Sequence, residues 1–453
     1  MGEKGLAVRE LALKVLFQVN EKGAYSDVAL ARALADSSLG RLDRSLVTEL
    51  VNGSVKYRLT LDWVLNQYLR RGLGRTPAWV RNILRLASYQ ILYLNRIPAS
   101  AACDTAVELT KRYAPQAAGT VNAVLRRLVR IGPPAFPSFS TDPVTYLSLK
   151  YSHPAWMVRR WLQRWGREWT EALLEANNRR PPLAVRINTL KAELQAVAAR
   201  LRGQGEEVWE SAFVPEGLIL GGWSFLERRP ELQEGQFVFQ DEGSMLVGHA
   251  LSPLPQTLVV DACAGQGTKT THLAQLTHDR ADILAVDRDP VRLVRLREAC
   301  ARLGIGCVRT RAADARRLRE LLDRPAAFVL VDAPCSGLGV LRRRADARWR
   351  KTPQDVAALP RLQLQLLEAA QAVLAPGGVL VYSTCTVEPE ENQEVVAELC
   401  RRHNDLVPED LTPYLPKPLT REEDRRQAQT GQLQLYPHLH GTDGFFIARL
   451  RKR

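Results

Sequence analysis

The chain has 453 residues, more than a single hydrophobic core usually holds, so two or three domains are expected. Its shares of hydrophobic residues (45%) and charged residues (25%) are ordinary for a globular protein, and no apolar run approaches the roughly 20 residues that a membrane-spanning helix needs. The net charge of +14 indicates a polyanionic partner such as RNA, although a GC-rich genome would give a similar excess of arginine.

The cysteines and the first residues of the chain suggest where the protein works. Seven cysteines are scattered without a C-x-x-C pair, which argues against a disulfide framework and against a zinc cage. The stretch MGEKGLAVRELALKVL mixes acids and bases in an amphipathic pattern and does not read as a signal peptide. We therefore expect a cytoplasmic monomer with no bound metal and no membrane contact.

Residues 1–130 predict a small helical domain. Their apolar residues recur at three- and four-residue spacing, for example in VRELALKVLFQV (8–19) and TVNAVLRRLVR (120–130). Residues 131–143 contain four prolines, which cannot continue a helix, and they predict a linker. In residues 144–235 a basic, tryptophan-bearing helix (HPAWMVRRWLQRWG) precedes a strand that turns into a helix, which predicts a small α+β module.

Residues 236–453 alternate between apolar runs and helical stretches. Strands that alternate with helices indicate an α/β domain with a mainly parallel, doubly wound sheet. In such a sheet ligands bind beyond the carboxyl ends of the strands, so the residues that end each strand are candidates for a site. The expected strands are TLVVDAC (257–263), DILAVD (282–287), GCVRT (306–310), AFVLVDA (327–333), GVLVYS (378–383) and GFFIARL (444–450).

The first of these strands ends in a glycine-rich loop, DACAGQGTKTTHL (261–273). Gly265 and Gly267 would let the backbone turn tightly and approach a ligand, and the following helix would present free N–H groups. The loop lacks the G-x-x-x-x-G-K-[ST] spacing that cradles phosphates. By itself this pattern is weak evidence, because it fits nucleotides and many cofactors.

An aspartate follows each of the next two strands. Asp287 ends the second strand, where a carboxylate can accept hydrogen bonds from ribose hydroxyls, and Asp314 follows the third, where it could accept from an adenine amino group. Each aspartate alone could instead be a helix N-cap. Together with the glycine-rich loop, the two acids favour a cofactor that contains adenosine.

The fourth and fifth strands each end near a cysteine. The fourth runs into Asp332 and Cys335 (FVLVDAPCSGLG), and the fifth runs into Thr384 and Cys385 (VLVYSTC). A lone cysteine is normally a small apolar filler, but these two stand where polar residues begin, on strands expected to be neighbours. A thiolate that adds to C6 of a pyrimidine turns the poorly nucleophilic C5 into an enamine carbon that can attack a methyl group.

This chemistry would use every group at the two strand ends. One thiol attacks, a carboxylic acid at N3 offsets the charge that develops, and a second base takes the C5 proton so that the thiol can leave. Basic neighbours or a helix N-terminus would have to lower the pKa of the attacking thiol. The residues alone do not show whether Cys335 or Cys385 attacks.

Three motifs carry a resemblance to a known family: DACAGQGTKTTHL, DAPCSGLG and YSTCTVEPEENQEV. With them the chain resembles the RNA 5-methylcytosine methyltransferases of the RsmB/NOP family, and within them the bacterial 16S ribosomal RNA enzymes. Residues 1–130 look like the RNA-binding antitermination factor NusB, and residues 144–235 look like the family's small RNA-binding module. The resemblance implies a Rossmann-like methyltransferase domain over residues 236–453, S-adenosylmethionine as cofactor and 16S ribosomal RNA as partner.

The family's site residues fall on matching positions of this chain. By resemblance, Cys385 is the nucleophile, Cys335 helps to release the product and Asp332 contacts N3 of the base. The family's cofactor loop usually reads CAAPGGKT and here reads CAGQGTKT, so Gln266 replaces a proline and Thr268 a glycine, which would alter the stiffness of the loop. The implied cofactor-binding residues are Cys263, Ala264, Gly265, Gln266, Gly267, Thr268, Lys269, Asp287, Arg292, Asp314 and Asp332.

Arginines are the candidates for contacts with RNA phosphates. A target cytosine would have to be unstacked to reach two thiols inside a pocket. Three other functions are a transfer RNA cytosine methyltransferase, an amino-group methyltransferase, and a non-catalytic ribosome-assembly or antitermination factor. The thiols and acids argue against the last two, and only the helical domain argues against the first. The candidate phosphate contacts are Arg159, Arg160, Arg186, Arg342, Arg343 and Arg344.

Overall fold

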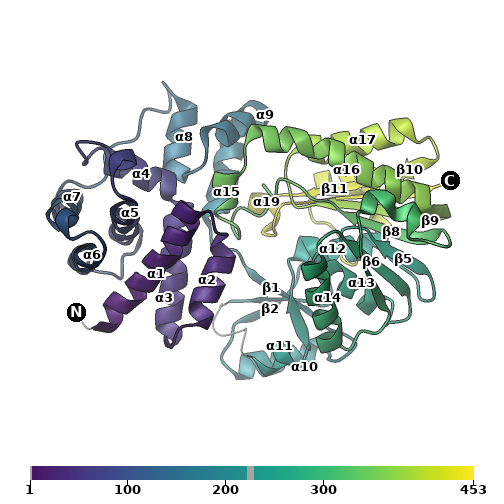
Figure 1. Ribbon diagram of the computed structural model, residues 1–453. Coiled ribbons are helices and arrows are strands. Elements are labelled where there is room, and N and C mark those ends of the chain that lie inside the picture. The colour runs from purple at the N-terminus through teal and green to yellow at the C-terminus, as the bar shows by residue number, and fades with distance from the viewer. Residues whose placement is uncertain (1–2, 222–228) are drawn as a thin grey trace. The chain divides into compact units, whose positions relative to one another are not determined.

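The computed structural model describes residues 3–221 and 229–453, and the chain forms two compact units (Figure 1). The first unit comprises Met1–Arg179 and Leu341–Arg350, and the second comprises Arg180–Val340 and Lys351–Arg453. Each unit has its own buried apolar clusters. The predicted segment 144–235 crosses the boundary after Arg179, so the four segments predicted from the sequence do not coincide with these two units and stay a prediction.

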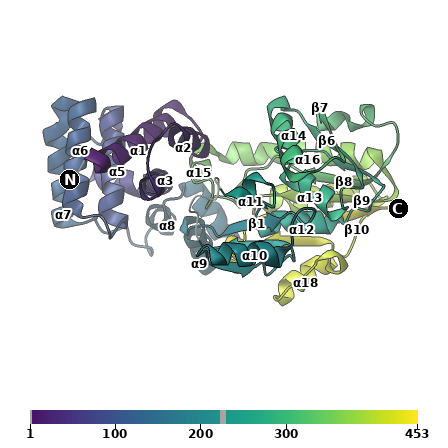
Figure 2. The same cartoon turned by 90° about the horizontal axis from the view of Figure 1, so that it is seen from below.

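The first unit is built from helices. They are α1 (Glu3–Lys22), α2 (Ser26–Ala35), α3 (Arg41–Lys56), α4 (Arg58–Asn66), η1 (Leu73–Arg75), α5 (Ala78–Tyr93), α6 (Ala99–Tyr113), η2 (Pro115–Ala117) and α7 (Ala118–Ile131). In α7 the buried residues Val121, Val124, Leu125 and Leu128 lie three and four residues apart, so they share one face. Figure 2 shows α5, α6 and α7 side by side. The predicted helical domain is therefore confirmed.

Two more helices of this unit follow the proline-rich segment: α8 (Pro143–Tyr151) and α9 (Ala155–Asn178). Residues 132–142 form neither helix nor strand, as their prolines predict. Helix α9 is the predicted basic helix, and Gly166, with a φ of 75°, interrupts its helical geometry. On α9 the rings of Trp165 and Trp169 stack with their centroids 3.8 Å apart.

A segment from much later in the chain, Leu341–Arg350, belongs to the first unit and ends in α15 (Ala347–Arg350). The backbone N–H and the hydroxyl of Ser26 both donate to the carboxylate of Asp346, at 3.3 and 2.9 Å. The indole N–H of Trp349 donates to the backbone oxygen of Val55 at 2.7 Å. The chain thus leaves the second unit after Val340, forms part of the first unit, and returns.

The second unit begins with a small antiparallel sheet. Its elements are β1 (Leu183–Ile187), α10 (Leu194–Gly203), β2 (Val208–Glu210), β3 (Gly217–Leu220), α11 (Pro230–Gln233) and β4 (Phe237–Phe239). The strand order is β2-β3-β1-β4. Val185 and Leu218 on this sheet share a buried cluster with Val197 and Leu201 of α10. The predicted strand that turns into a helix is confirmed.

The larger sheet has eight strands. They are β5 (Leu258–Asp261), β6 (Asp282–Asp287), β7 (Val308–Ala312), β8 (Ala326–Asp332), β9 (Leu374–Thr384), β10 (Leu406–Pro408), β11 (Gln432–Leu435) and β12 (Phe445–Lys452). The order is β10-β12-β9-β8-β5-β6-β7, with β11 paired to β12. Strands β5 to β9 pair in parallel, and β12 runs antiparallel to β9. The mainly parallel, Rossmann-like sheet is confirmed.

Helices cover both faces of this sheet (Figure 1). The helices in this part of the chain are α12 (Glu242–Leu251), α13 (Thr268–Leu276), α14 (Pro290–Leu303), α16 (Pro353–Val373), α17 (Gln393–Arg402), α18 (Glu422–Gln429) and α19 (Pro437–His440), with the short 3-10 helices η4 (Ala315–Glu320), η5 (Pro389–Glu391) and η6 (Thr412–Tyr414). Leu273 of α13 and Leu293 of α14 belong to the buried cluster on one face. Leu367 of α16 and Val396 of α17 belong to the cluster on the other face.

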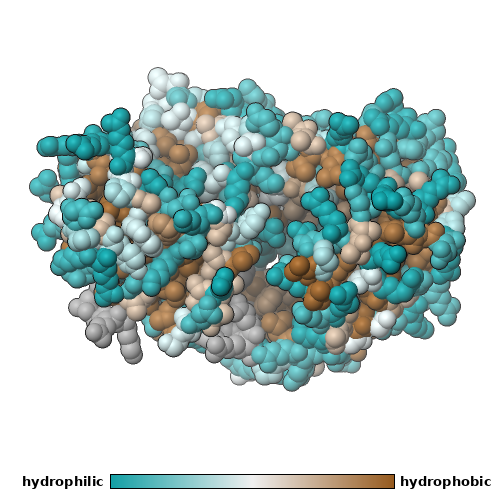
Figure 3. Space-filling view, viewed as in Figure 1, coloured by the Kyte–Doolittle hydropathy of each residue, from teal (hydrophilic) through white to brown (hydrophobic). Residues whose placement is uncertain are grey.

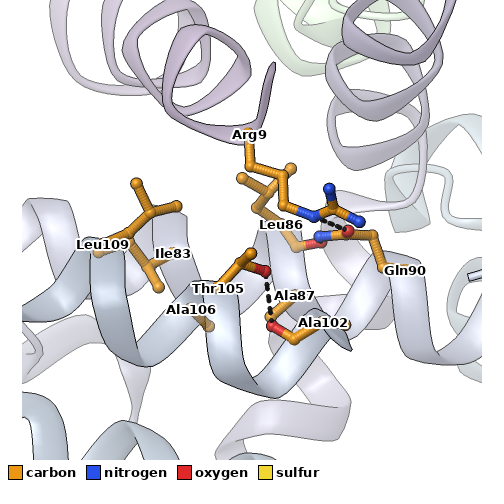
Figure 4. Close-up of a pocket in the computed structure, with 9 residues that line it drawn as sticks. All are labelled: Arg9, Ile83, Leu86, Ala87, Gln90, Ala102, Thr105, Ala106 and Leu109. Carbon is orange, nitrogen blue, oxygen red and sulfur yellow. Dashed lines mark hydrogen bonds between the residues drawn. The ribbon is translucent and has the colours of Figure 1, made fainter. Parts of the chain in front are cut away.

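The face seen in Figure 3 is mostly hydrophilic, with apolar side chains in scattered patches. No helix in the described part of the chain is long and apolar enough to cross a bilayer. Figure 4 shows a small pocket of the helical unit, lined by residues of α1, α5 and α6, where Nε of Arg9 donates to Oε1 of Gln90 at 2.7 Å. Its lining contains none of the acids or cysteines predicted for the site.

Candidate active site

The two predicted cysteines lie next to each other. Cys335 follows β8 and Cys385 follows β9, and because these strands are parallel neighbours, their carboxyl ends meet at one edge of the sheet. The two Sγ atoms are 3.2 Å apart. The backbone N–H of Cys385 also donates to Sγ of Cys335, at 3.3 Å. The structure therefore brings both thiols into one site.

This contact keeps a proton on Cys335. The hydrogen bond with Cys385 and then burial raise the pKa of Cys335 well above that of an ordinary thiol. The two thiols therefore titrate as a pair, in which loss of a second proton is much harder than loss of the first. Such a pair can present one thiolate and one thiol at the same time.

Asp332 connects the cysteine site to the glycine-rich loop. Its Oδ2 lies 2.8 Å from Nζ of Lys269, and its Oδ1 accepts the hydroxyl of Ser383 at 2.8 Å. Lys269 comes from the loop after β5, and its ammonium also lies over the ring of Phe445, 5.0 Å from the centroid. The carboxyl group of Asp332 is thus fixed at the end of β8, partly exposed.

Gly267 makes the tight turn of the loop possible. Its φ is +87°, and a Cβ at this position would lie 2.0 Å from Cδ1 of Leu296 on α14. Gly265 also has a positive φ, +56°, but a Cβ there would meet no described atom within 4 Å. The backbone N–H of Gly265 donates to Oδ2 of Asp287 at 2.9 Å. The predicted loop and the predicted ribose acid therefore lie together.

Carboxylates surround the first cysteine of the loop. Burial and then the charges of Asp261, Asp332, Asp287 and Asp314 raise the pKa of Cys263 well above that of an ordinary thiol. Cys263 therefore stays protonated and is not a nucleophile. An acidic lining of this kind suits a ligand that carries positive charge and hydroxyl groups.

Asp261 is an acid of the site to which the sequence analysis gave no role. Its side chain is 1% exposed, and Oδ2 accepts the hydroxyl of Thr270 at 2.6 Å. Burial raises the pKa of Asp261 to about 7; Thr270 opposes this shift and Asp332 adds to it. Its Oδ1 has no hydrogen-bond partner among residues 3–221 and 229–453. An unpartnered buried oxygen is costly, so this atom fits a ligand group that donates to it.

Local contacts hold two other predicted cofactor residues. Asp314 accepts the backbone N–H of Arg316 at 3.0 Å and caps η4, so the alternative role of a helix N-cap is confirmed for it. Arg292 is exposed and lies 3.9 Å from Oδ2 of Asp287. Gln266 and Thr268, the departures from the usual family loop, are both exposed, so they alter its outer edge and not its packing.

The prediction that Arg186 contacts an RNA phosphate is wrong. Its side chain is fully buried on β1 and donates to Oε1 of Gln275, to the hydroxyl of Thr271 and to the backbone oxygen of Thr268. A buried guanidinium that is bonded to protein acceptors cannot reach a phosphate. Arg186 instead joins the small sheet to α13, the helix that follows the glycine-rich loop.

The other candidate arginines belong to the first unit. Arg159 on α9 and Arg344 are exposed, and Arg160 and Arg343 are partly exposed. Arg342 is 7% exposed, so little of its side chain faces solvent, and its contact with a phosphate stays a prediction. Arg159 and Arg344 remain available for phosphate contacts at the surface of the first unit.

Glu216, His249 and His272 form a cluster that the sequence analysis did not anticipate. Nε2 of each histidine lies 2.8 Å from Oε1 of Glu216, and the three groups could ligate a metal. Burial and then the charge of Arg186 lower the pKa of His272 to about 3, so its ring is neutral. The nearby guanidinium opposes a cation, and Nδ1 of His272 has no partner in the described chain, whereas a metal-bound histidine usually donates from this atom. We interpret the cluster as a hydrogen-bond network that joins the small sheet to α12 and α13.

Three buried residues around the two cysteines were also missed: Gln363, Glu391 and Asn392. A signal existed for two of them, because the acidic stretch EPEEN follows the strand of Cys385 directly and has neither helical nor strand periodicity. Nothing in the sequence marks Gln363, which lies in the middle of the amphipathic helix α16.

Comparisons with known proteins match three parts of the chain to family models. The model described as 16S rRNA methyltransferase RsmB/F matches residues 248–451. The model of the NusB family matches residues 6–130. A ferredoxin-like domain of RsmF/B-like methyltransferases matches residues 153–223.

Curated relatives match along the whole chain. "Probable ribosomal RNA small subunit methyltransferase B" from Bacillus subtilis is 36% identical over 99% of this chain and 100% of the relative. The protein of the same name from a Synechocystis species is 37% identical, with the same coverage. "Ribosomal RNA small subunit methyltransferase B" from Klebsiella pneumoniae is 33% identical over 100% of this chain and 99% of the relative.

Solved structures have the same fold. PH0851 matches with a TM-score of 0.84 and 28% identity, over 100% of this chain and 99% of its own. A methyltransferase homologue from Pyrococcus horikoshii matches with a TM-score of 0.60 and 31% identity, over 69% of this chain and 99% of its own. NSun6 from the same organism, solved with SFG, has a TM-score of 0.58 and 25% identity, over 66% of this chain and 98% of its own.

These matches agree with the geometry of the molecule. The helical domain is NusB-like, the small sheet belongs to a ferredoxin-like module, and the larger sheet is that of a methyltransferase whose cofactor is S-adenosylmethionine. The chain belongs to the 16S rRNA methyltransferase RsmB/F family.

Proposed function

We propose that this chain methylates carbon 5 of a cytosine in 16S ribosomal RNA, through a covalent bond between Cys385 and C6 of the base. As a member of its family the chain is a ribosomal RNA methyltransferase, and the names of its curated relatives support the small-subunit RNA as substrate. The observation that carries the proposal is the 3.2 Å separation of the sulfur atoms of Cys335 and Cys385. Methylation of an amino group needs no thiol, so a paired-thiol site favours methylation of carbon.

In the first step Cys385 attacks as a thiolate. Its electron pair forms the S–C6 bond, the C5=C6 electrons shift to C4–C5, and the C4=N3 pair moves to N3. N3 takes up a proton as this charge develops, and Asp332, fixed at the end of β8, accepts the hydrogen bond from the resulting N3–H. Bound S-adenosylmethionine supplies an electrophilic methyl group. The C4=C5 electrons of the base form the new bond from C5 to this methyl group, the lone pair of N3 restores C4=N3, and N3 releases the proton that it took up.

In the second step Cys335 releases the product. It removes the proton from C5, the C–H electrons form the C5=C6 double bond, and the C6–S bond breaks with its electrons returning to Cys385. The neighbouring thiol is the largest cause of the raised pKa of Cys335. Once the sulfur of Cys385 is bonded to carbon, this cause is removed and the pKa of Cys335 falls. Cys335 can then lose its own proton to solvent and act as the thiolate that takes the C5 proton.

The first unit offers groups that suit RNA. Arg159 and Arg344 are exposed cations, and the stacked rings of Trp165 and Trp169 are partly exposed on α9. Cations bind the phosphate backbone, and aromatic rings stack on unpaired bases. The target cytosine must leave its stack to reach the two thiols, so an unpaired or opened site is the expected substrate.

The cysteine roles can be tested with the full-length protein, unmethylated 16S ribosomal RNA and methyl-labelled S-adenosylmethionine. We expect Cys385→Ala to give neither methylated RNA nor a covalent protein–RNA adduct. Cys335→Ala should accumulate the adduct, because the C5 proton is not removed. Cys300→Ala, which removes a buried thiol of α14, should behave as wild type and serves as the matched control.

Other outcomes would overturn particular parts of the proposal. An adduct that forms in Cys385→Ala but not in Cys335→Ala would reverse the roles of the two thiols. Methylated RNA without an adduct in any variant would contradict the covalent route. Activity on transfer RNA and none on 16S ribosomal RNA would show that the proposed substrate is wrong.

A further inference from the structure

Glu391 and Asn392 are consecutive residues whose side chains are fully buried just after the strand of Cys385. They stand in the acidic stretch that follows β9, a place where solvated side chains are usual. Burial raises the pKa of Glu391, since a buried carboxylate loses its hydration. A buried acid and a buried amide side by side therefore need partners, and their partners flank the two cysteines.

Glu391, together with Gln363, holds the backbone on both sides of Cys335. Its Oε2 accepts the N–H of Ser336, the next residue, at 2.8 Å. The same oxygen accepts Nε2 of Gln363 at 3.0 Å, and this amide also donates to the backbone oxygen of Pro334, the preceding residue, at 3.0 Å. Glu391 and Gln363 thus bind the two peptide groups between which Cys335 is placed.

Asn392 holds the two residues that flank Cys385, Thr384 through its side chain and Thr386 through its backbone. The hydroxyl of Thr384 donates to Oδ1 of Asn392 at 2.5 Å, and Nδ2 of Asn392 donates to the backbone oxygen of Thr386 at 3.2 Å. Nδ2 also donates to Oε1 of Gln434 at 2.8 Å, which fixes the orientation of the amide. The residues before and after Cys385 are therefore both bound to one side chain.

We infer that Glu391 and Asn392 are two separate positioning residues, Glu391 for the thiol of Cys335 and Asn392 for the thiol of Cys385. This inference rests on the proposed function, in which the two thiols act in different steps. Each acts through the residues that flank its cysteine. Two neighbouring residues of one turn thus serve different steps, attack and release.

The consequence is that substitutions at adjacent positions should have opposite effects on the covalent adduct. Glu391→Ala leaves Cys385 in place and loosens Cys335, so attack proceeds and release slows. Adduct should accumulate at least about tenfold over wild type, as in Cys335→Ala. Glu391→Gln should accumulate an amount of adduct between those of wild type and Glu391→Ala. Asn392→Ala loosens Cys385, so formation of the adduct should slow at least about tenfold and no adduct should accumulate.

The readout is the ratio of adduct to released methylated RNA in a single turnover, because a general loss of folded protein lowers both together. Gln363→Leu and Thr384→Val provide second variants. The first should reproduce the accumulation of adduct, since it removes the donor to Pro334, and the second should reproduce the slow attack, since it removes the donor to Asn392. Glu394→Gln changes an exposed acid of α17 and is the matched control with a wild-type ratio.

The result that overturns the inference is an unchanged ratio in Glu391→Ala and Gln363→Leu while Cys335→Ala traps the adduct. Equal ratios in Glu391→Ala and Asn392→Ala would overturn it as well. Failure of the proposed function looks different, because Cys335→Ala itself would then trap no adduct. The two failures are therefore distinguishable in the same set of reactions.

Discussion

Asp261 is a buried acid whose protonation should affect stability near neutral pH. Burial raises its pKa to about 7, whereas an aspartate in an unfolded chain has a pKa of about 3.9. Between these values the folded chain keeps a proton that the unfolded chain has released, so stability falls as the pH rises through this window. The side chain of Asp261→Asn cannot ionise. From about pH 4.5 to about pH 7.5 the free energy of unfolding of this variant should therefore rise by up to ~4 kcal/mol relative to wild type.

Urea unfolding of both proteins across this range measures the effect, and Asp279→Asn is the control. Although burial opposes it, hydrogen bonds from Cys307 and Gly306 lower the pKa of Asp279. The stability that Asp279 contributes is present above the unfolded pKa of about 4 and is lost only below it. The difference in free energy of unfolding between Asp279→Asn and wild type should therefore stay constant from about pH 4.5 to about pH 7.5. The same pH dependence in Asp261→Asn and Asp279→Asn would contradict the role of burial at Asp261.

Single residues differed in how far the sequence could predict them. Cys335, Cys385, Asp332 and Lys269 could be placed together, because each stands at a strand end and parallel strands meet at one edge. Arg186 could not be assigned, because the packing against β1 that buries it is a tertiary property. The role of Glu391 depends on a partner 55 residues away, and local periodicity does not report such a contact.

The turn between β5 and α13 depends on the absence of a side chain at Gly267. A Cβ there would lie 2.0 Å from Cδ1 of Leu296, so Gly267→Ala must displace the Leu296 side chain, the loop or α14. Because this loop supplies Lys269 and the N–H that binds Asp287, we expect the affinity for S-adenosylmethionine to fall at least about tenfold. Isothermal titration of the cofactor measures the change.

Two further variants separate the clash from backbone strain. Gly265→Ala also places a side chain at positive φ, but the new Cβ would meet no described atom within 4 Å. Gly265→Ala should carry only the backbone strain of ~1–2 kcal/mol for such a conformation. It should therefore weaken the binding of S-adenosylmethionine less than Gly267→Ala does. Gly267→Ala combined with Leu296→Ala removes the clashing methyl group and should recover part of the affinity; no recovery would show that the contact with α14 is not the cause.

At the scale of elements, the strands of the methyltransferase sheet were predictable because each is an apolar run that ends in polar residues. The predicted runs correspond to β5, β6, β7, β8, β9 and β12. Strands β10 and β11 were not anticipated; they have three and four residues, and only pairing with β12 defines them. Elements this short carry too little periodicity to be separated from loops.

For the whole molecule, the division into two units follows the chain only in part. The stretch Leu341–Arg350 comes soon after Cys335 in the sequence, yet it belongs to the first unit. Arg348 in this stretch is fully buried and donates to the backbone oxygens of Ser152 and Asn177. Arg342, Arg343 and Arg344 of this stretch were predicted to contact phosphates, and its packing in the first unit was not anticipated, because no local pattern shows that a loop of one domain folds with another.

Asp346 should keep this stretch folded with the first unit. Its carboxylate accepts the N–H and the hydroxyl of Ser26 and pairs with Arg350 at 3.0 Å. Asp346→Ala removes these bonds, worth about 2 kcal/mol for a charged acceptor. The open form, in which residues 341–350 are detached from the rest of the first unit, should therefore become at least ~10-fold more populated.

Limited trypsin digestion detects the open form, because cleavage after the arginines of residues 342–344 tracks its population when opening is fast. We expect Asp346→Ala to be cut there at least ~10-fold faster than wild type, with fragments identified by mass spectrometry. Asp323→Ala, which changes an exposed acid of the second unit, should be cut at the wild-type rate. Equal rates for Asp346→Ala and wild type would mean that the bonds to Ser26 do not hold the stretch. Faster cleavage would show that the chain connecting Cys335 to α16 is anchored by the NusB-like domain.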